Sequence, residues 1–301
     1  MPSLLDLRNR LEYAALRVVV WLLRLAPLDM AGNISACIWQ WVAPYGRRQR
    51  RALDNIARAF PEMPDADRRR IIHAMWGNLG RVMVETMQID RIIADPSRID
   101  FVSEAVFKRY LGKMGPAVAM TLHMGNWELT AWPMTRTGWH AAAVYRLVKN
   151  PYVDRYLREQ RRVIYPAGLL ARGSDYEGDD SEGQRTARRI MDFVRQGGRL
   201  GIVSDLYDRN GIPVPFFGTE ARSTLVPAMI ARRVGSRIWI ARCVRIGAAS
   251  RFRIEVKELK VAWTANVADD IRTTTLAAQR QFEEWIREVP EQWMWSNRRW
   301  S

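Results

Sequence analysis

A histidine and a glutamate stand close together in the stretch from Thr121 to Glu128, which has the sequence Thr-Leu-His-Met-Gly-Asn-Trp-Glu. Transfer of an acyl group to an alcohol needs such a pair, because an alcohol is a poor nucleophile until a base takes its proton. Imidazole is the usual base near neutral pH, and a carboxylate fixes its tautomer and stabilises the imidazolium. His123 is therefore a candidate general base, and Glu128 is the candidate carboxylate that orients it. The same spacing also fits a hydrogen-bonded histidine at a strand end beside a solvated helix glutamate.

The segments around this pair are expected to hold it at the edge of a sheet. The apolar run 117–120 predicts a buried strand, which places His123 at the carboxyl end, where open α/β sheets bind their ligands. The chain then turns into a predicted helix that begins near Trp127, with Asn126 as its N-cap and Glu128 in its first turn. We also count Asn126 among the candidate substrate-binding residues.

The His-Met-Gly-Asn-Trp-Glu motif resembles that of the lipid A late acyltransferases, the lauroyl and myristoyl transferases of Gram-negative bacteria, within the wider His-x4-Asp/Glu acyltransferases. Two later segments match the same family in the same order. One contains Asp205 and then Val-Pro-Phe-Phe-Gly, although Leu206 replaces a frequent glutamine. The other is the tail 290–300, where Asn297 replaces the usual histidine, which excludes any role there that needs an imidazole.

Arginines near the motif are candidates for binding charge. The segment 144–154 resembles the Tyr-Arg-(x)-Asn-Pro segment of the family, with Leu147 in place of a usual proline, and it contains Arg146. The resemblance implies that a helix arginine downstream is functional, and Arg161 aligns best. Either arginine could bind a phosphate or stabilise the oxyanion that forms on a thioester carbonyl. A solvated basic helix face is the alternative.

Asp205 and Phe217 are the remaining candidates for substrate binding. The apolar run 199–204 predicts a second buried strand, and Asp205 follows at its carboxyl end. The loop that leads to Phe217 is rich in proline and aromatic residues, which suits an acyl chain or the mouth of its pocket. Packing in the core is the alternative for this loop. In the tail, Arg298 and Arg299 are further candidates for binding phosphate.

The composition limits the class of protein. The formal net charge of +15 implies an anionic partner, which could be nucleic acid, an acidic membrane face or an acidic protein. A nucleic-acid-binding protein is disfavoured because the sequence has no helix-turn-helix, zinc-finger or RNA-binding motif. A zinc hydrolase using His123, Glu128 and Asp205 is disfavoured because none of the three histidines is paired at ligand spacing. Two cysteines far apart suggest a reducing compartment.

The first sixty residues are predicted to form membrane-anchoring helices, followed by a catalytic domain over 61–301. Within the segment 4–27, residues 13–25 are strongly apolar but carry Arg17 and Arg24, which makes an ordinary spanning helix doubtful. Arg10, Arg17 and Arg24 recur at every seventh position and would share one helix face. It suits a helix that lies in or dips obliquely into an anionic surface, and a soluble amphipathic helix packed on the body is the alternative. A second apolar helix over 28–45 precedes the basic cluster 47–51, which suits acidic lipid head groups.

The rest of the chain predicts an α/β fold with a central, mostly parallel sheet flanked by helices, as the resemblance also implies. Asp65 is expected to cap a long helix, and the segment 168–183 is expected to be an acidic loop. Further helices are predicted over 103–111, 184–196, 222–234 and 265–289, and further strands over 141–145, 237–246 and 252–259.

The resemblance implies a membrane-associated O-acyltransferase that moves a fatty acyl chain from acyl carrier protein to a hydroxyl of a lipid A precursor, at the cytoplasmic face of the bacterial inner membrane. The chain has no Gly-x-Ser-x-Gly nucleophile elbow, so we expect direct transfer without an acyl-enzyme. The thioester drives the reaction, so no metal or organic cofactor is expected beyond the phosphopantetheine of the carrier. A lysophospholipid or another glycolipid is the alternative acceptor.

Overall fold

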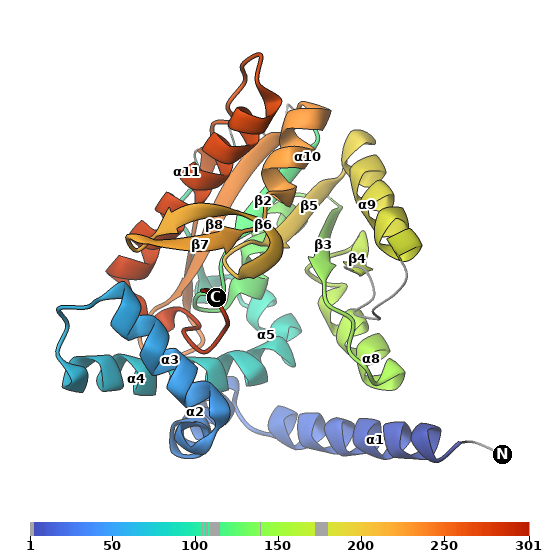
Figure 1. The fold of residues 1–301 in the computed structure, drawn as a ribbon. Helices are drawn as coiled ribbons and strands as arrows, with labels where there is room; N and C mark the ends of the chain where they lie inside the picture. The colour runs from blue at the N-terminus through green and yellow to red at the C-terminus, as the bar shows by residue number, and fades with distance from the viewer. Residues whose placement is uncertain are drawn as a thin grey trace.

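A seven-stranded sheet forms the centre of the molecule in the computed structural model, which describes residues 3–103, 105, 108, 115–138, 140–171 and 180–300 (Figure 1). The strand order is β1-β9-β8-β2-β5-β3-β4. All neighbouring strands are parallel except β8 and β9, which form an antiparallel pair. The mostly parallel α/β sheet predicted from the sequence is therefore confirmed.

The strands of this sheet are short, and most follow the apolar runs of the sequence. They are β1 (Ile99–Phe101), β2 (Ala117–Thr121), β3 (Ala141–Tyr145), β4 (Gly168–Ala171), β5 (Arg199–Val203), β8 (Arg237–Arg245) and β9 (Phe252–Leu259). The larger helices are α1 (Leu4–Leu25), α2 (Leu28–Val42), α3 (Arg47–Ala59), α4 (Asp65–Thr86), α8 (Pro151–Arg161), α9 (Asp180–Arg195), α10 (Val226–Val234) and α11 (Val267–Glu288). Shorter helices are η1 (Ala43–Tyr45), α5 (Ile89–Ile93), η2 (Pro96–Arg98), η3 (Trp127–Ala131), α7 (Trp132–Arg136) and η4 (Pro290–Gln292).

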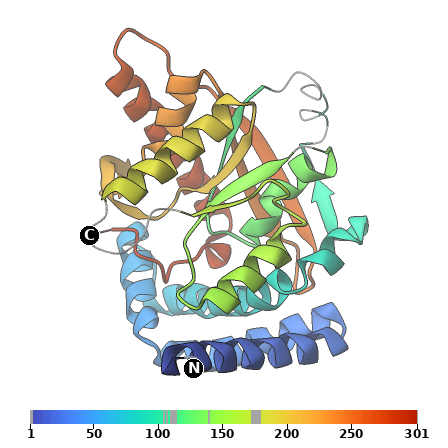
Figure 2. The ribbon, with the colours of Figure 1, turned by 90° about the vertical axis from the view of Figure 1, so that its right-hand side faces the viewer.

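Both faces of the sheet are covered by helices, as two views at right angles show (Figures 1 and 2). Alternate side chains of a strand point to opposite faces, so β2 contributes to two cores. Val118 and Met120 pack in a core shared with α4, α9, α10 and α11. Ala117 lies in the other core, with residues of α5 and α7. A near-continuous apolar strand is the expected consequence of burial on both faces.

The N-terminal helices pack along the body in different ways. α1 lies beside α8, and α2 packs on α4. α3 joins the main core through Ile56, and the Asn55 side-chain amide donates to the carbonyl oxygens of Trp295 and Asn297, at 2.8 Å each. The division at residue 60 stays a prediction, but α3 is part of the same core as the sheet. Among the helices that the structure describes, none has the length and apolar character needed to cross a membrane.

The structure corrects several local predictions. The segment predicted as a stiff loop and the start of a helix is a two-stranded hairpin of β6 (Tyr207–Phe216) and β7 (Thr219–Ser223), which α10 follows. The segment 168–183 begins with strand β4, and α9 starts at Asp180. Pro64, rather than Asp65, precedes the first turn of α4, and no side chain caps this helix. Most of the predicted helix 103–111 lies outside the described residues.

Candidate active site

Two neighbouring parallel strands bring His123 and Asp205 together. β2 and β5 pair in register, with Thr121 opposite Val203, so both chains leave the sheet at the same edge. The backbone N–H of Ser204 donates to the carbonyl oxygen of Thr121 at 2.8 Å, which extends the pairing by one residue. His123 and Asp205 each lie two residues beyond the end of their strand. The carboxyl edge of the sheet therefore holds an imidazole and a carboxylate side by side.

The Asp205 carboxylate is fully buried and accepts three hydrogen bonds. Its Oδ1 lies 2.8 Å from Nδ1 of His123. Its Oδ2 accepts from the backbone N–H of His123 at 2.8 Å and from the indole N–H of Trp293 at 2.7 Å. Burial on its own raises the pKa of Asp205, but the imidazole and these donors outweigh burial and hold the pKa below its usual value. The carboxylate is consequently ionised at neutral pH.

This arrangement sets the tautomer of His123. Since an ionised carboxylate only accepts hydrogen bonds, Nδ1 carries a proton and Nε2 is left with its lone pair. The side chain of His123 is 16% exposed, so the ring is accessible. Trp127 packs against it edge to face, with ring centroids 4.9 Å apart. His123 is therefore held in the form that can accept a proton at Nε2.

Glu128 has a different partner from the one predicted. It lies in the 3-10 helix η3, where its Oε1 accepts from Nε of Arg161 at 2.9 Å and lies 2.8 Å from Nη2 of the same guanidinium. Within the described part of the chain, no hydrogen bond joins Glu128 to His123. The prediction that Glu128 orients the imidazole is therefore corrected, because Asp205 has that position. A direct part for Glu128 in the reaction stays a prediction.

The ion pair between Glu128 and Arg161 links the motif to α8. Only 9% of the Glu128 side chain and 23% of the Arg161 side chain are exposed. Burial on its own lowers the pKa of Arg161. The Glu128 carboxylate outweighs burial, so the pKa of Arg161 lies above its usual value. The last turn of α8 therefore presents a permanently charged guanidinium beside the segment that follows His123.

A buried polar network supports the turn after His123, and the sequence analysis did not find it. Nη2 of Arg245 in β8 donates to Oε2 of Glu85 in α4 at 2.7 Å, and Nε donates to the side-chain oxygen of Asn78 at 2.9 Å. The amide of Asn126 donates to Glu85 at 3.1 Å, and that of Asn78 donates to the carbonyl oxygen of Gly125 at 3.3 Å. The Asn126 side chain thus anchors the turn to Glu85 of α4. The prediction that Asn126 caps the following helix is wrong, because its side chain makes no capping hydrogen bond to η3.

Backbone hydrogen bonds to the C-terminal segment also hold the turn around Gly125 in place. Gly125 has a φ of +56°, and an added Cβ would overlap the carbonyl oxygen of Cys243. Its N–H donates to the carbonyl oxygen of Gln292 at 3.0 Å, and the N–H of Met294 donates to the carbonyl oxygen of His123 at 3.0 Å. Only a glycine fits this conformation and this close approach. The tail thereby positions the backbone on both sides of Met124.

Two other predicted site residues, Arg146 and Phe217, lie in different surroundings. Arg146 is exposed directly after β3, at the same carboxyl edge of the sheet as His123. Phe217, at the tip of the β6–β7 hairpin, is 5% exposed and packs against the ring of Phe60, with centroids 5.3 Å apart. Its packing in the core is thus observed, and its contact with an acyl chain stays a prediction.

The two tail arginines also differ. Arg299 is 1% exposed and donates to the Ser223 hydroxyl at 2.8 Å and to the Gln279 side-chain oxygen at 3.0 Å. Burial lowers its pKa to about 10. Its predicted role in binding phosphate is corrected, since its guanidinium is enclosed by the protein. Arg298 lies over the ring of Tyr207, 4.1 Å from its centroid.

Residues 2–301 match the sequence model of a family described as bacterial lipid A biosynthesis acyltransferase. The chain belongs to this family. The resemblance inferred from the three motifs is confirmed, and it extends over nearly the whole chain. Membership supports an enzyme that transfers acyl groups in lipid A synthesis. The search of curated proteins found no match.

The part of this acyltransferase that the structure describes contains no candidate metal centre. No three side chains of His, Cys, Asp or Glu are placed there to share an ion. Cys243, behind the active-site turn, is fully buried, and burial raises the pKa of its thiol to about 12. A thiol with such a pKa stays protonated at neutral pH and is a poor nucleophile.

Trp293, Glu85 and Arg245 are the site residues that sequence analysis missed. Trp293 lies in the tail that matches the family, but nothing in that motif says which residue its indole meets. Glu85 stands within the mostly apolar second half of α4, where a carboxylate needs a buried partner. A lone carboxylate in such a segment indicates a buried partner. The partner itself, Arg245, is 160 positions away and could be identified only from the fold.

Proposed function

We propose that this chain transfers a fatty acyl chain from the phosphopantetheine thioester of acyl carrier protein directly to a hydroxyl of a lipid A precursor. The observation that carries the proposal is the His123–Asp205 pair at the carboxyl edge of the sheet, in a chain of the lipid A biosynthesis acyltransferase family. The imidazole has one nitrogen engaged by a buried carboxylate and the other available. That is the arrangement a general base needs to activate an alcohol.

His123 acts first as a base and then as an acid in this proposal. Nε2 takes the proton of the acceptor hydroxyl while its oxygen attacks the thioester carbonyl, which forms the new C–O bond and places negative charge on the carbonyl oxygen. Asp205 stabilises the imidazolium that results. When the carbonyl re-forms, the C–S bond breaks, and the imidazolium returns its proton to the departing thiolate. The products are an ester and a free thiol, and the enzyme is regenerated.

Arg161 supplies positive charge beside this reaction. Its guanidinium is held by Glu128 in the last turn of α8, so its orientation is set before substrate binds. We assign it to the oxyanion or to a phosphate of the acceptor, since both are anions that a fork of N–H donors binds well. Glu128 is thus a positioning residue for Arg161. Arg146, at the same sheet edge, is a second cation for a phosphorylated acceptor.

The surface charge suits both proposed substrates. The chain carries a formal net charge of +15, whereas acyl carrier proteins are acidic and lipid A precursors carry phosphates. Phe217 packs against Phe216, and Phe216 packs against Trp293, the residue whose indole donates to Asp205. We assign this aromatic region to the acyl chain. The phosphopantetheine arrives with the carrier, so it is part of the donor substrate.

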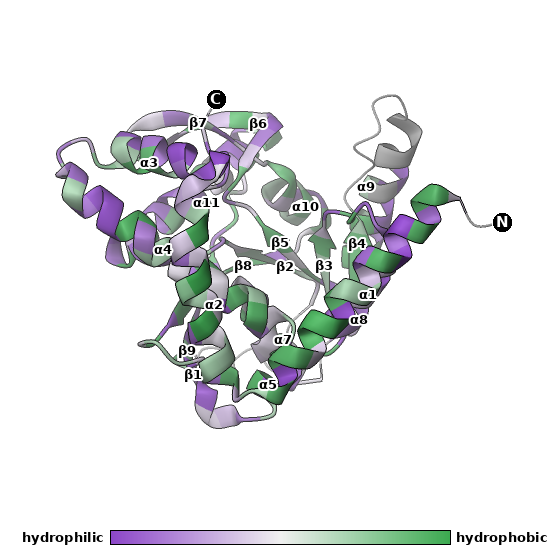
Figure 3. Ribbon diagram, turned by 90° about the horizontal axis from the view of Figure 1, so that it is seen from below, coloured by the Kyte–Doolittle hydropathy of each residue, from purple (hydrophilic) through white to green (hydrophobic). Residues whose placement is uncertain are grey.

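We further propose that α1 and α2 lie on the cytoplasmic face of the bacterial inner membrane. Viewed from below, both helices carry hydrophobic residues along their outer sides (Figure 3). On α2, the exposed residues Met30, Ile34, Ile38 and Trp41 follow helical spacing on the side away from the body. The exposed arginines at the start of α3 follow directly. Apolar surface beside basic residues is typical of helices that bind anionic bilayers.

Mass spectrometry of the acceptor tests the reaction. Purified enzyme in detergent receives acyl carrier protein thioesters of several chain lengths, with a phosphorylated lipid A precursor or with lysophosphatidic acid. We expect one acyl mass to be added to the precursor, and we expect the rate to fall at least about 10²-fold in His123→Ala. His140→Ala, at an exposed histidine outside the site, is the matched control and should keep full activity.

The possible outcomes distinguish an error in the proposed mechanism from an error in the proposed acceptor. Acylation of lysophosphatidic acid alone would retain the mechanism and assign the enzyme to phospholipid synthesis. Full activity of His123→Ala would refute the proposed base. Metal analysis of the active, purified enzyme checks the zinc hydrolase alternative, which requires about one bound zinc per chain.

A further inference from the structure

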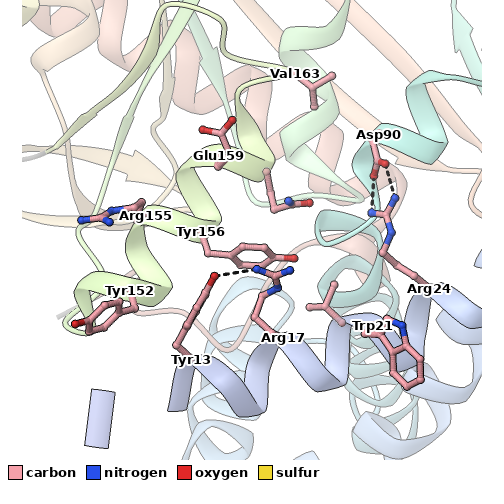
Figure 4. Close-up of a pocket in the computed structure, with 12 residues that line it drawn as sticks. Tyr13, Arg17, Trp21, Arg24, Asp90, Tyr152, Arg155, Tyr156, Glu159 and Val163 are labelled. Carbon is pink, nitrogen blue, oxygen red and sulfur yellow. Dashed lines mark hydrogen bonds and ion pairs between the residues drawn. The ribbon is translucent and has the colours of Figure 1, made fainter. Parts of the chain in front are cut away.

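A cavity of about 890 Å³ lies between α1 and α8 (Figure 4). On α1 it is lined by Tyr13, Arg17, Trp21 and Arg24, whose spacing of three or four residues places them on one helix face. On α8, Arg155 and Tyr156 belong to the facing stripe. Two helix faces rich in arginine and aromatic residues thus enclose one space.

The charges in this cavity are unevenly balanced. Arg24 is satisfied, since its two terminal nitrogens donate to the two oxygens of Asp90 at 3.0 and 2.6 Å. Arg17 donates to the neutral hydroxyl of Tyr13 at 2.9 Å and lies 5.2 Å from the ring centroid of Tyr156. Glu159 also lines the cavity, and its carboxylate lies 3.3 Å from Nη1 of Arg162. Among the described residues, no ion pair joins Arg17 or the exposed Arg155 to a carboxylate. The cavity therefore contains two cations with donors to spare.

Apolar surface continues directly from this cavity. Trp21 lines the cavity but is 61% exposed, and it is followed on α1 by the exposed Leu22 and Leu25. Figure 4 shows the indole at the lower right edge of the cavity, below Arg24. Tryptophan favours the boundary between head groups and acyl chains. A ligand that fits both features has an anionic head and an apolar tail.

We propose that this cavity binds the phosphate of an anionic glycerophospholipid of the bilayer, distinct from the acyl acceptor. Arg17 donates to the phosphate oxygens from α1. The Arg155 side chain, which is directed away from Arg17 in Figure 4, turns toward the phosphate from α8 when the lipid binds. Trp21 lies at the level of the glycerol and the first acyl carbons. Guanidinium groups bind phosphate through paired N–H donors, so two arginines form a specific site rather than a diffuse charge. This inference does not depend on the proposed reaction.

The position of the cavity gives the bound lipid a consequence for the enzyme. Arg155 and Tyr156 face the cavity, whereas Arg161, at the end of the same helix, faces Glu128. A lipid held between α1 and α8 would therefore fix the candidate active site at a set distance from the bilayer. Substrate with a long acyl chain would not need to leave the membrane surface completely.

Vesicle co-sedimentation of the full-length chain tests this site. The vesicles contain either phosphatidylcholine alone or phosphatidylcholine with phosphatidylglycerol. The pocket variant is Arg17→Gln/Arg155→Gln, and the control is Arg8→Gln/Arg69→Gln, which removes two exposed arginines outside the cavity. Both variants lose two positive charges, so general attraction to an anionic surface falls equally.

We expect the phosphatidylglycerol vesicles to bind the pocket variant roughly tenfold more weakly than the control. His123→Ala should bind like the unchanged chain, which separates this result from any failure of the proposed reaction. Equal weakening in the two double variants, or equal binding to both vesicle types, would overturn the proposal. Displacement from the vesicles by millimolar inorganic phosphate would overturn it as well, because the site would then bind free phosphate.

Circular dichroism and the thermal unfolding midpoint check that both variants fold. If the pocket variant does not fold, Arg17→Lys/Arg155→Lys replaces it, with Arg8→Lys/Arg69→Lys as its control. Lysine keeps the charge and loses the forked donors. Weakening of at least about threefold relative to that control then supports the site, and no difference refutes it.

Discussion

Replacing Asp205 by asparagine tests the central feature of the site. The two side chains have nearly the same shape, but the amide has one oxygen and one NH2 group. The Oδ2 position accepts from the backbone of His123 and from Trp293, so it favours the amide oxygen. The NH2 group then occupies the Oδ1 position, 2.8 Å from Nδ1 of His123. It donates to Nδ1 and forces the proton onto Nε2, where the base needs its lone pair.

The expected loss is large because the tautomer and the charge change together. The wrong tautomer removes general-base catalysis, and no carboxylate stabilises the imidazolium. Trapping the wrong tautomer in the serine protease triad lowers kcat by about 10⁴-fold, and we expect a loss of roughly 10³–10⁴-fold here. The measurement is kcat for acyl transfer from saturating acyl carrier protein thioester. KM for the acceptor should change little, since Asp205 is fully buried and does not reach the substrate.

Glu128→Gln is the comparison that decides between the two carboxylates. If Asp205 orients His123, Glu128→Gln should leave much more activity than Asp205→Asn. The reasoning is refuted if Asp205→Asn keeps activity within about tenfold while Glu128→Gln loses a full general-base effect of 10²–10⁴-fold. Glu128 would then be the orienting group in the working enzyme, as the motif alone suggests.

Three further predictions concern the groups around this pair. Glu128→Gln and Arg161→Met should each lower kcat/KM by about 10–100-fold, and the double variant should be little worse than either, because the two act as a unit. Arg245→Met leaves the Glu85 carboxylate buried without its partner and should lower the free energy of unfolding by about 3–5 kcal/mol in urea denaturation. The pKa of Asp205 is lowered in the folded state, so the stability it contributes is present above about pH 4 and is lost as the pH falls through the folded pKa. Urea denaturation at several acidic pH values should therefore show a steeper loss of stability in the unchanged chain than in Asp205→Asn.

Much of the fold could be predicted from the sequence because its parallel strands are buried on both faces. Such strands are continuous apolar runs, and 117–120, 141–145 and 199–204 were all placed within a residue or two of β2, β3 and β5. The β6–β7 hairpin was missed for the opposite reason. It contains Pro213 and Pro215, which lack the N–H of a ladder residue and thus suggested a loop. A two-stranded ribbon outside the main sheet tolerates them.

The structure brings several of the predicted site residues together, but in other pairs than the sequence suggested. His123, Asp205, Glu128 and Arg161 all meet near the carboxyl edge of the sheet, two pairs of them in direct contact. Sequence proximity suggested the pair His123 and Glu128. Yet η3 turns Glu128 toward α8, while the register of β2 against β5 brings Asp205 to the imidazole from 82 positions away. Strand order, which decides this, has no local signal in the sequence.

The two carboxylates do different work because their surroundings differ. Asp205 is fully buried and accepts hydrogen bonds from a backbone N–H, an indole and the imidazole, and the buried Arg299 guanidinium interacts with it only through space. In the proposed reaction, the imidazolium is therefore the one cation that hydrogen-bonds to this carboxylate. Glu128 already neutralises a permanent cation, Arg161, and has little left to offer a transient one. A carboxylate in direct contact with the base stabilises the protonated base and so favours proton transfer to it. In the proposed reaction Asp205 therefore stabilises the base, and Glu128, five residues after His123, holds an arginine rather than the histidine.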